Sequence, residues 1–228
     1  VSGRPPRWIP KVADAAALNG YAVCANGAVL YEIGTDSVLS VRGLDPMLLH
    51  DVVDALESVL DGVSFAAERV GATAHEADVR QFVTEPGYRN PWDDAEGHTQ
   101  ARAELLGHTA VKLLASKANM TSDEMAMVAA EVLGDAVDIT FSTGDGLIEV
   151  SARGTTKAAG LSEVADRLNI APDDIISFGD MPNDVEMLRW SGHGVAMANG
   201  HPEVLAVADE VTATNSEDGV AQVLERWF

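Results

Sequence analysis

Two aspartates four positions apart are the residues of this sequence whose type and spacing most directly indicate chemistry. Asp180 and Asp184 follow the apolar run 175–179, which is typical of a buried parallel strand ending in a tight turn. Ligands usually bind at the carboxyl ends of such strands in open α/β sheets, and carboxylates there suit a hard cation such as Mg²⁺. The alternative is local, because Asp180 or Asn183 would cap the following helix and Asp184 would favour its positive end. The pair by itself leaves both interpretations open.

Lys157 also lies in an unusual position, because it begins the helix that periodicity predicts over residues 157–168. The dipole of a helix is positive at its N-terminus, so a cation there is disfavoured unless another group stabilises it. The alternative is a solvated lysine at a helix start. We interpret Lys157 as a candidate functional residue on this ground.

Composition restricts the partners and the compartment. Lys and Arg number 15 against 36 Asp and Glu, a formal net charge of -21, which argues against nucleic acid or an anionic membrane as partner. The single cysteine, Cys24, lies in an apolar, strand-like segment and is predicted to be a buried structural thiol rather than a nucleophile. One cysteine forms no internal disulfide, and the sequence shows neither a signal peptide nor an apolar run approaching the roughly 18 residues of a membrane span. We expect a cytoplasmic protein, monomeric or homodimeric.

The elements that would position these residues fall into three regions. Residues 1–40 predict a loop entering a helix at 8–18, then strands at 21–24 and 28–31 around the turn signal Asn26-Gly27. Residues 41–152 predict helices and short antiparallel strands, which is an α+β pattern. Its expected elements are a helix at 45–60, strands at 63–70 and 110–115, a helix from the capping box at Thr121 to 133, and paired strands at 137–142 and 147–152.

After residue 153 the pattern changes to alternating helices and strands. The expected helices are 157–168, 181–190, 201–208 and 216–227, and the expected strands are 174–179, 194–197 and 210–212. Such alternation predicts parallel βα units. The sequence therefore predicts an α/β core, residues 1–40 and 153–228, divided by an inserted α+β domain at about 41–152.

In this arrangement the sequence resembles the haloacid dehalogenase-like phosphohydrolases, specifically their Cof-type branch with a large inserted cap. Ser2-Gly3-Arg4 resembles the family's second motif, a Ser or Thr at a strand tip, and Cys24-Ala25-Asn26-Gly27-Ala28 resembles a segment common in the branch. Residues 154–161 resemble the third motif, which carries the lysine, and 179–184 the acidic fourth. The four segments occur in the family's order and span nearly the whole chain. The resemblance implies an α/β fold, a Rossmann-like doubly wound parallel sheet core with an inserted α+β cap domain.

The resemblance also implies a Mg²⁺-dependent phosphatase of small phosphorylated metabolites, a sugar phosphate or similar, that acts through an aspartyl-phosphate intermediate. Asp180 would be a metal ligand. Asp184 would join it through water or hold Lys157 in an ion pair, and Lys157 would contact the phosphoryl group. Phosphate-binding residues implied in addition are Ser2, Gly3, Arg4, Asn26 and Asn183. For Asn26 the alternative is turn chemistry alone, for Asn183 a helix cap, and for Ser2 no role.

The loop at 84–98 offers Tyr88, Arg89 and Trp92 as candidate selectivity contacts of the cap, the alternative being an ordinary packed loop. The family's first motif, a strand ending in Asp-x-Asp that supplies the nucleophile, has no counterpart in the sequence. Our preferred hypothesis is that the native protein begins further upstream. The competing one is a non-catalytic relative that binds a phosphorylated ligand or a metal. A receiver-like signalling domain also uses Asp and Mg²⁺, but the large insertion and the late acidic motif argue against it.

Overall fold

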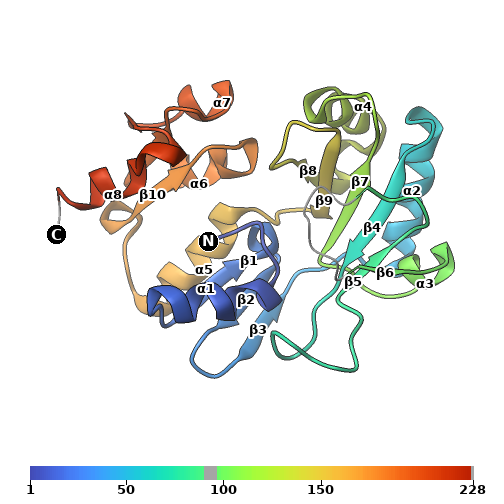
Figure 1. The fold of residues 1–228 in the computed structure, drawn as a ribbon, viewed down its shortest axis with the longest axis horizontal. Helices are drawn as coiled ribbons and strands as arrows, with labels where there is room; N and C mark the ends of the chain where they lie inside the picture. The colour runs from blue at the N-terminus through green and yellow to red at the C-terminus, as the bar shows by residue number, and fades with distance from the viewer. Residues whose placement is uncertain (90–96, 227–228) are drawn as a thin grey trace. The chain divides into compact units, whose positions relative to one another are not determined.

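The computed structural model describes residues 1–89 and 97–226. It divides into two compact units, Val1–Thr155 and Thr156–Phe228, and Figure 1 labels most of their elements. Among the described residues, the first unit holds two sheets and the second holds one, and each unit has its own buried core. The boundaries predicted for the core and the cap, at residues 40 and 153, remain predictions.

The first unit opens with a small antiparallel sheet. A 3-10 turn, Pro6–Trp8, leads into helix α1, Ile9–Ala16, as predicted for this segment. Strands β1 (Tyr21–Cys24), β2 (Val29–Glu32) and β3 (Ser37–Val41) follow in the order β1-β2-β3. The first two strands were expected, whereas β3 was not, because its half-buried residues show no strong alternation. Between β1 and β2 the chain turns through Asn26, whose φ is +58°.

The remainder of this unit is a six-stranded sheet of order β6-β5-β4-β7-β9-β8. Only β5 and β6 are parallel; the other neighbours are antiparallel. The strands are β4 (Ser64–Glu68), β5 (Phe82–Thr84), β6 (His98–Thr99), β7 (Lys112–Ser116), β8 (Val137–Thr140) and β9 (Leu147–Ala152).

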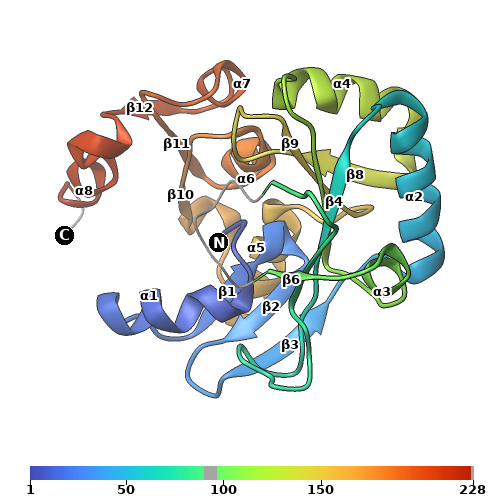
Figure 2. The ribbon, with the colours of Figure 1, turned by 45° about the vertical axis from the view of Figure 1, so that its right-hand side comes forward.

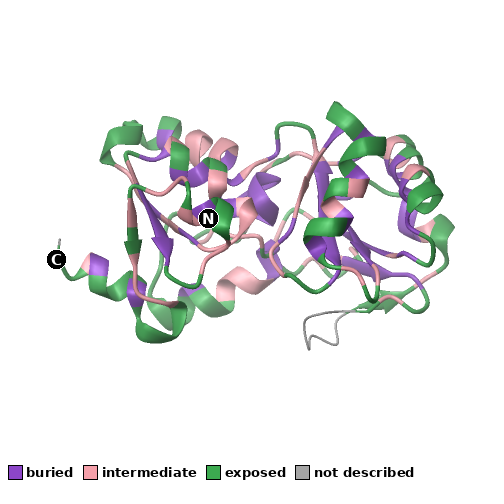
Figure 3. Ribbon diagram, turned by 90° about the horizontal axis from the view of Figure 1, so that it is seen from above, coloured by how far each residue is buried: buried purple, intermediate pink, exposed green. Residues whose placement is uncertain are grey.

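Helices α2 (Pro46–Val59), α3 (Arg102–Leu106) and α4 (Ser122–Leu133) pack on one side of this sheet (Figure 2). Phe65, Leu113 and Ile148 belong to the apolar cluster that these helices share with the sheet, and all three are fully buried. The other face carries every second strand residue, including Lys112 and Glu149, because successive side chains of a strand point to opposite faces. Strands β4, β7 and β9 are almost entirely buried, whereas β6 is exposed; Figure 3 colours the ribbon by burial.

The segment predicted as a loop, 84–98, is shorter at both ends than expected. Strand β5 ends at Thr84 and strand β6 begins at His98, and helix α3 follows. These elements are two to five residues long, which leaves no room for a periodic pattern. The predicted contact Trp92 lies outside the described residues. The predicted capping box is confirmed, with Thr121 and Glu124 bonding reciprocally at the start of α4.

The second unit alternates helices with a parallel sheet, as its sequence predicts. Its order is α5 (Lys157–Leu168), β10 (Ile176–Gly179), α6 (Val185–Trp190), β11 (His193–Met197), α7 (Pro202–Leu205), β12 (Glu210–Thr212) and α8 (Gly219–Leu224). Strands pair in parallel in the order β10-β11-β12. Leu188, Ala196 and Val204 form its buried core.

Two further expectations concern single features. Cys24 is fully buried, as predicted, and burial raises the pKa of its thiol to about 12, which disfavours the nucleophilic thiolate form. Among residues 1–89 and 97–226, none of the helices has the length and apolarity needed to cross a lipid bilayer.

Candidate functional site

The two predicted aspartates lie at the carboxyl end of β10, in a turn that Asp184 itself organises. Asp184 Oδ2 accepts hydrogen bonds from the backbone N–H groups of Asp180, at 3.0 Å, and Met181, at 3.1 Å. This fold of the turn needs glycine at position 179, since a Cβ there would lie 2.4 Å from the Cβ of Asp184. The sequence Gly179-Asp180 therefore ends the strand and presents Asp180 beside a buried carboxylate.

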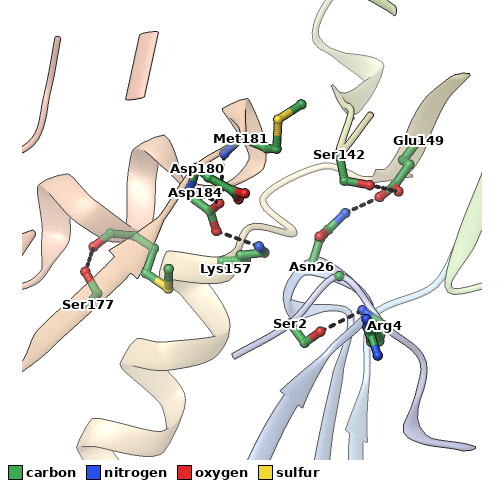
Figure 4. A network of polar contacts seen from close by, with 12 residues as sticks. Ser2, Arg4, Asn26, Ser142, Glu149, Lys157, Ser177, Asp180, Met181 and Asp184 are labelled. Atoms are coloured by element: carbon green, nitrogen blue, oxygen red, sulfur yellow. Dashed lines mark hydrogen bonds and ion pairs between the residues drawn. The ribbon is translucent and has the colours of Figure 1, made fainter. Parts of the chain in front are cut away.

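Lys157 pairs with the other oxygen of Asp184. Its Nζ donates to Asp184 Oδ1 at 2.5 Å, and the two residues are 8% and 4% exposed (Figure 4). The carboxylate offsets the unfavourable position of a cation at the first residue of α5. Thr156 caps this helix, its side chain accepting from Ala159 N–H at 3.2 Å. Of the two roles predicted for Asp184, the structure shows the ion pair.

Asp180 is less engaged than Asp184. It is half-buried, and its Oδ2 accepts from Asn215 Nδ2 at 2.7 Å. Asn183 lies half-buried in the 3-10 turn Pro182–Asp184 that leads into α6. The described residues hold no cluster of three or more His, Cys, Asp or Glu side chains of the kind that encloses a metal. Asp180 is thus the carboxylate of this turn whose oxygens are least occupied by protein donors.

In the first unit, the predicted phosphate-binding residues lie in two bonded segments. Ser2 Oγ accepts from Arg4 N–H at 3.0 Å, and the Arg4 guanidinium lies over the Trp8 ring, 5.5 Å from its centroid. The backbone N–H groups of Ala25 and Asn26 donate to the carbonyls of Arg4, at 2.9 Å, and Ser2, at 3.1 Å. The segment 2–4 and the turn at 25–26 are therefore one local structure.

Asn26 lies in a turn, as one of its two interpretations predicts, and its side chain makes a buried polar contact that the sequence did not indicate, while its role in phosphate binding stays a prediction. Its backbone is left-handed, and its Nδ2 donates to Glu149 Oε2 at 2.6 Å (Figure 4). Glu149 is 1% exposed and also accepts from Lys112 Nζ and from Ser142 Oγ. Burial by itself raises the pKa of Glu149, but the Lys112 charge and the three hydrogen bonds outweigh it and lower the pKa below its ordinary value.

Sequence reasoning missed Lys112 and Glu149. A signal was present, because each is a charged residue inside an apolar strand, in Val111-Lys112-Leu113 and Ile148-Glu149-Val150. Their pairing was not readable, since 37 positions separate them. Arg7 and Glu68 form a second buried ion pair of this unit that the sequence did not indicate.

Of the predicted selectivity contacts, Tyr88 and Arg89 are described. The Tyr88 hydroxyl is buried and has no hydrogen-bond partner among the described residues, and its ring packs edge-on against Phe82 with centroids 6.2 Å apart. Burial, followed by the charges of Glu149 and Glu68, raises the pKa of this hydroxyl. Arg89 is exposed and lines a cavity of about 650 Å³ together with Lys117, Asn119 and Asp145.

Comparison with known proteins gives a family and a fold. A family model described as haloacid dehalogenase-like hydrolase matches residues 1–224. Among solved structures, the sugar phosphatase BT4131 of subclass IIB matches with a TM-score of 0.78 at 22% identity, over 99% of this chain and 83% of that one. A haloacid dehalogenase-like hydrolase from Bacillus subtilis matches with a TM-score of 0.79 at 21% identity, over 99% and 86%. The predicted fold class, a Rossmann-like α/β core with a cap domain, is confirmed.

Curated relatives match over a shorter stretch. The 5-amino-6-(5-phospho-D-ribitylamino)uracil phosphatase YitU of Bacillus subtilis is 46% identical over 82 residues, which are 36% of this chain and 30% of that protein. The chain spans between 16% and 32% of the length of the first curated relatives that it matches.

Proposed function

The chain belongs to the haloacid dehalogenase-like hydrolases, and we propose that it acts as a phosphatase of small phosphorylated metabolites. The observation that carries this proposal is the buried Lys157–Asp184 pair beside Asp180 at the carboxyl end of β10. Both members of the pair are less than a tenth exposed; burying two charges carries a desolvation cost, and such buried titratable groups concentrate at binding and catalytic sites. A phosphate monoester is an anionic ligand that a positioned ammonium group and a metal-binding carboxylate suit.

We assign the roles as follows. Lys157 donates to a phosphoryl oxygen and balances its charge, while Asp184 orients Lys157 and fixes the turn. Ser2, Gly3, Arg4 and Asn26 offer backbone and side-chain donors to phosphate oxygens, and Asn183 offers its amide. Each role follows from the donors and acceptors of the side chain and from the family resemblance.

The residues at the end of β10 fit a Mg²⁺ ion that keeps most of its waters. Mg²⁺ is usually held by one or two carboxylates plus substrate phosphate oxygens rather than by a full protein cage. Asp180 would supply one carboxylate, and Asp184, whose oxygens already accept from Lys157 and the turn, would contribute through water. When bound, the ion would neutralise charge on the phosphoryl oxygens.

For the reaction itself we propose phosphoryl transfer through an aspartyl-phosphate, followed by hydrolysis to inorganic phosphate. None of the aspartates of this sequence occurs as Asp-x-Asp, and we assign the nucleophile to none of them. A second candidate function is binding of a phosphorylated ligand without turnover, which the Lys157–Asp184 pair and Asp180 would also support. The substrate class we propose is a sugar phosphate or similar compound, supported by the names of a phosphoribityl phosphatase and a sugar phosphatase among the similar proteins.

Hydrolysis of p-nitrophenyl phosphate by the native protein tests the proposal. We expect turnover that requires Mg²⁺ and stops when EDTA is added. Asp180→Asn should lower kcat/KM at least about a hundredfold, as expected for loss of a group that stabilises transition-state charge. The matched control is Asp174→Asn, an exposed aspartate of the segment before β10, which should retain wild-type rates.

Three outcomes are decisive. Turnover that is indifferent to Asp180→Asn contradicts the assignment of the site. Binding of inorganic phosphate without any turnover supports the second candidate. Absence of both binding and turnover removes the proposed function. A screen of phosphorylated metabolites then identifies the substrate.

A further inference from the structure

A buried ion pair between Lys112 and Glu149 lies where the six-stranded sheet contacts the first residues of the chain. Lys112, on β7, is 4% exposed and Glu149, on β9, is 1% exposed, with Lys112 Nζ 2.8 Å from Glu149 Oε2. Desolvating two charges costs free energy, and well-packed apolar residues of the same volume often stabilise a fold equally well. The stability of the sheet alone therefore does not account for the pair.

Each member of the pair holds a different N-terminal segment. Lys112 Nζ donates a second hydrogen bond to the carbonyl of Gly3 at 2.9 Å. Glu149 Oε2 accepts from Asn26 Nδ2 at 2.6 Å, and its Oε1 accepts from Ser142 Oγ at 2.9 Å (Figure 4). One ion pair thus fixes both segments that carry candidate phosphate-binding residues.

The turn that Glu149 holds has an unfavourable backbone. Ala25 and Asn26 both have positive φ, +49° and +58°, a region that residues with a Cβ seldom occupy. Asn tolerates it better than Ala, whose side chain offers no local hydrogen bond. A strained backbone conformation of this kind persists only where surrounding contacts hold it in place, and such conformations are concentrated at ligand-binding sites. Two kinds of contact hold this turn. The backbone N–H groups of Ala25 and Asn26 donate to the carbonyls of Arg4 and Ser2, and the Asn26 side chain donates to Glu149.

We propose that Lys112 and Glu149 are positioning residues that hold segment 2–4 and the Asn26 turn in the arrangement that binds phosphate. The proposal rests on the proposed function, because it takes these segments to bind the phosphoryl group. Neither residue touches the substrate. Lys112 fixes the carbonyl of Gly3, Glu149 fixes the side chain of Asn26, and the donors of both segments are ordered before the ligand arrives. Order that precedes binding raises affinity because less conformational entropy is lost on binding.

Amide hydrogen exchange tests the positioning directly, without substrate. The variant is Lys112→Met with Glu149→Gln, since removing one member alone leaves an uncompensated buried charge. The control replaces an exposed residue of each type, Lys11→Met with Glu131→Gln. We expect the amides of Ala25 and Asn26 to exchange at least about tenfold faster in the variant and at wild-type rates in the control. Unchanged exchange at both amides in the variant overturns the proposal.

Calorimetric titration with inorganic phosphate tests the consequence. The dissociation constant should rise about tenfold or more in the double variant, and KM for a phosphate ester should rise while kcat changes less than about threefold. The dissociation constant and KM of Lys112→Arg should lie between those of wild type and the double variant, because the guanidinium keeps the charge but displaces the donor from the Gly3 carbonyl. If the double variant does not fold, amide exchange and phosphate titration are both measured on Lys112→Arg instead. Phosphate affinity equal to wild type overturns the proposal.

The two proposals fail in distinguishable ways. A wild-type protein that neither binds nor hydrolyses phosphate esters removes the proposed function and with it the role of these segments in phosphate binding. Accelerated exchange at Ala25 and Asn26 with normal phosphate affinity leaves the phosphatase proposal intact and overturns the positioning of a phosphate site by Lys112 and Glu149.

Discussion

Single residues of this protein carry more than one contact, and Asp184 is the clearest case. One oxygen accepts from Lys157 and the other from two backbone N–H groups, so the residue holds both a cation and a turn. Asp184→Ala leaves the Lys157 ammonium buried without its partner, which costs about 3–5 kcal/mol of the free energy of unfolding. Urea unfolding measures this loss of free energy, and the substitution of an exposed aspartate, Asp174→Ala, is the control. Equal losses for the two variants would contradict the importance of the pair.

Glu149 predicts a pH dependence with a definite sign. The folded protein holds the pKa of Glu149 below its ordinary value of 4.5, so its contribution to stability is complete above that pH and is lost as pH falls below it. Between the two pKa values the unfolded chain binds one more proton, which gives a slope of about 1.4 kcal/mol per pH unit. Unfolding free energies from pH 6 to pH 3.5 should therefore fall more steeply in wild type than in Glu149→Gln. Identical slopes would show that Glu149 does not titrate as described.

Among the elements, helix α5 depends on a capping residue next to the candidate site. Thr156 caps it and Lys157 is its first residue, so the first turn must be intact for Lys157 to reach Asp184. Thr156→Ala should cost about 1 kcal/mol of unfolding free energy, as is usual for loss of a capping hydroxyl. Thr156→Ser keeps an acceptor and should restore most of it. Urea unfolding of both variants decides the matter, and an equal loss in Thr156→Ser would exclude capping as the cause.

Elements with a strong local signal were predictable, and short ones were not. Helix α5 has the predicted bounds because apolar spacing and a cap residue agree. Strands β5 and β6 and helix α3 were missed because each is only two to five residues long, too short to show a periodic pattern. The candidate site divides in the same way. Lys157 and Asp184 follow recognisable motifs, whereas Lys112 and Glu149 meet only when β7 and β9 pair. A charge inside an apolar strand indicates such a residue but does not name its partner.

At the scale of the whole molecule, the excess of acidic residues has a measurable consequence. The formal net charge is -21 over 228 residues, and like charges on a compact surface repel one another more than in the expanded unfolded chain. Screening reaches about 10 Å at 0.1 M salt, so added salt weakens this repulsion while buried pairs such as Lys112–Glu149 change little. The apparent melting midpoint should therefore rise by several degrees between about 10 mM and 150 mM NaCl, since one kcal/mol corresponds to roughly 2–4 °C in a chain of this size.

KCl at the same ionic strength should give the same rise, because screening depends on ionic strength and not on which monovalent cation is present. Lowering the pH from 8 to 6 leaves nearly all carboxylates ionised, so that change should not reproduce the effect of salt. A midpoint that is flat or falls with NaCl would show that attractive surface pairs such as Arg226–Glu210 outweigh the net repulsion. Differential scanning fluorimetry over the salt series measures the melting midpoint and so distinguishes net repulsion from attractive surface pairs. Repulsion spread over the whole surface, rather than any single pair, is the cause that a rise would support.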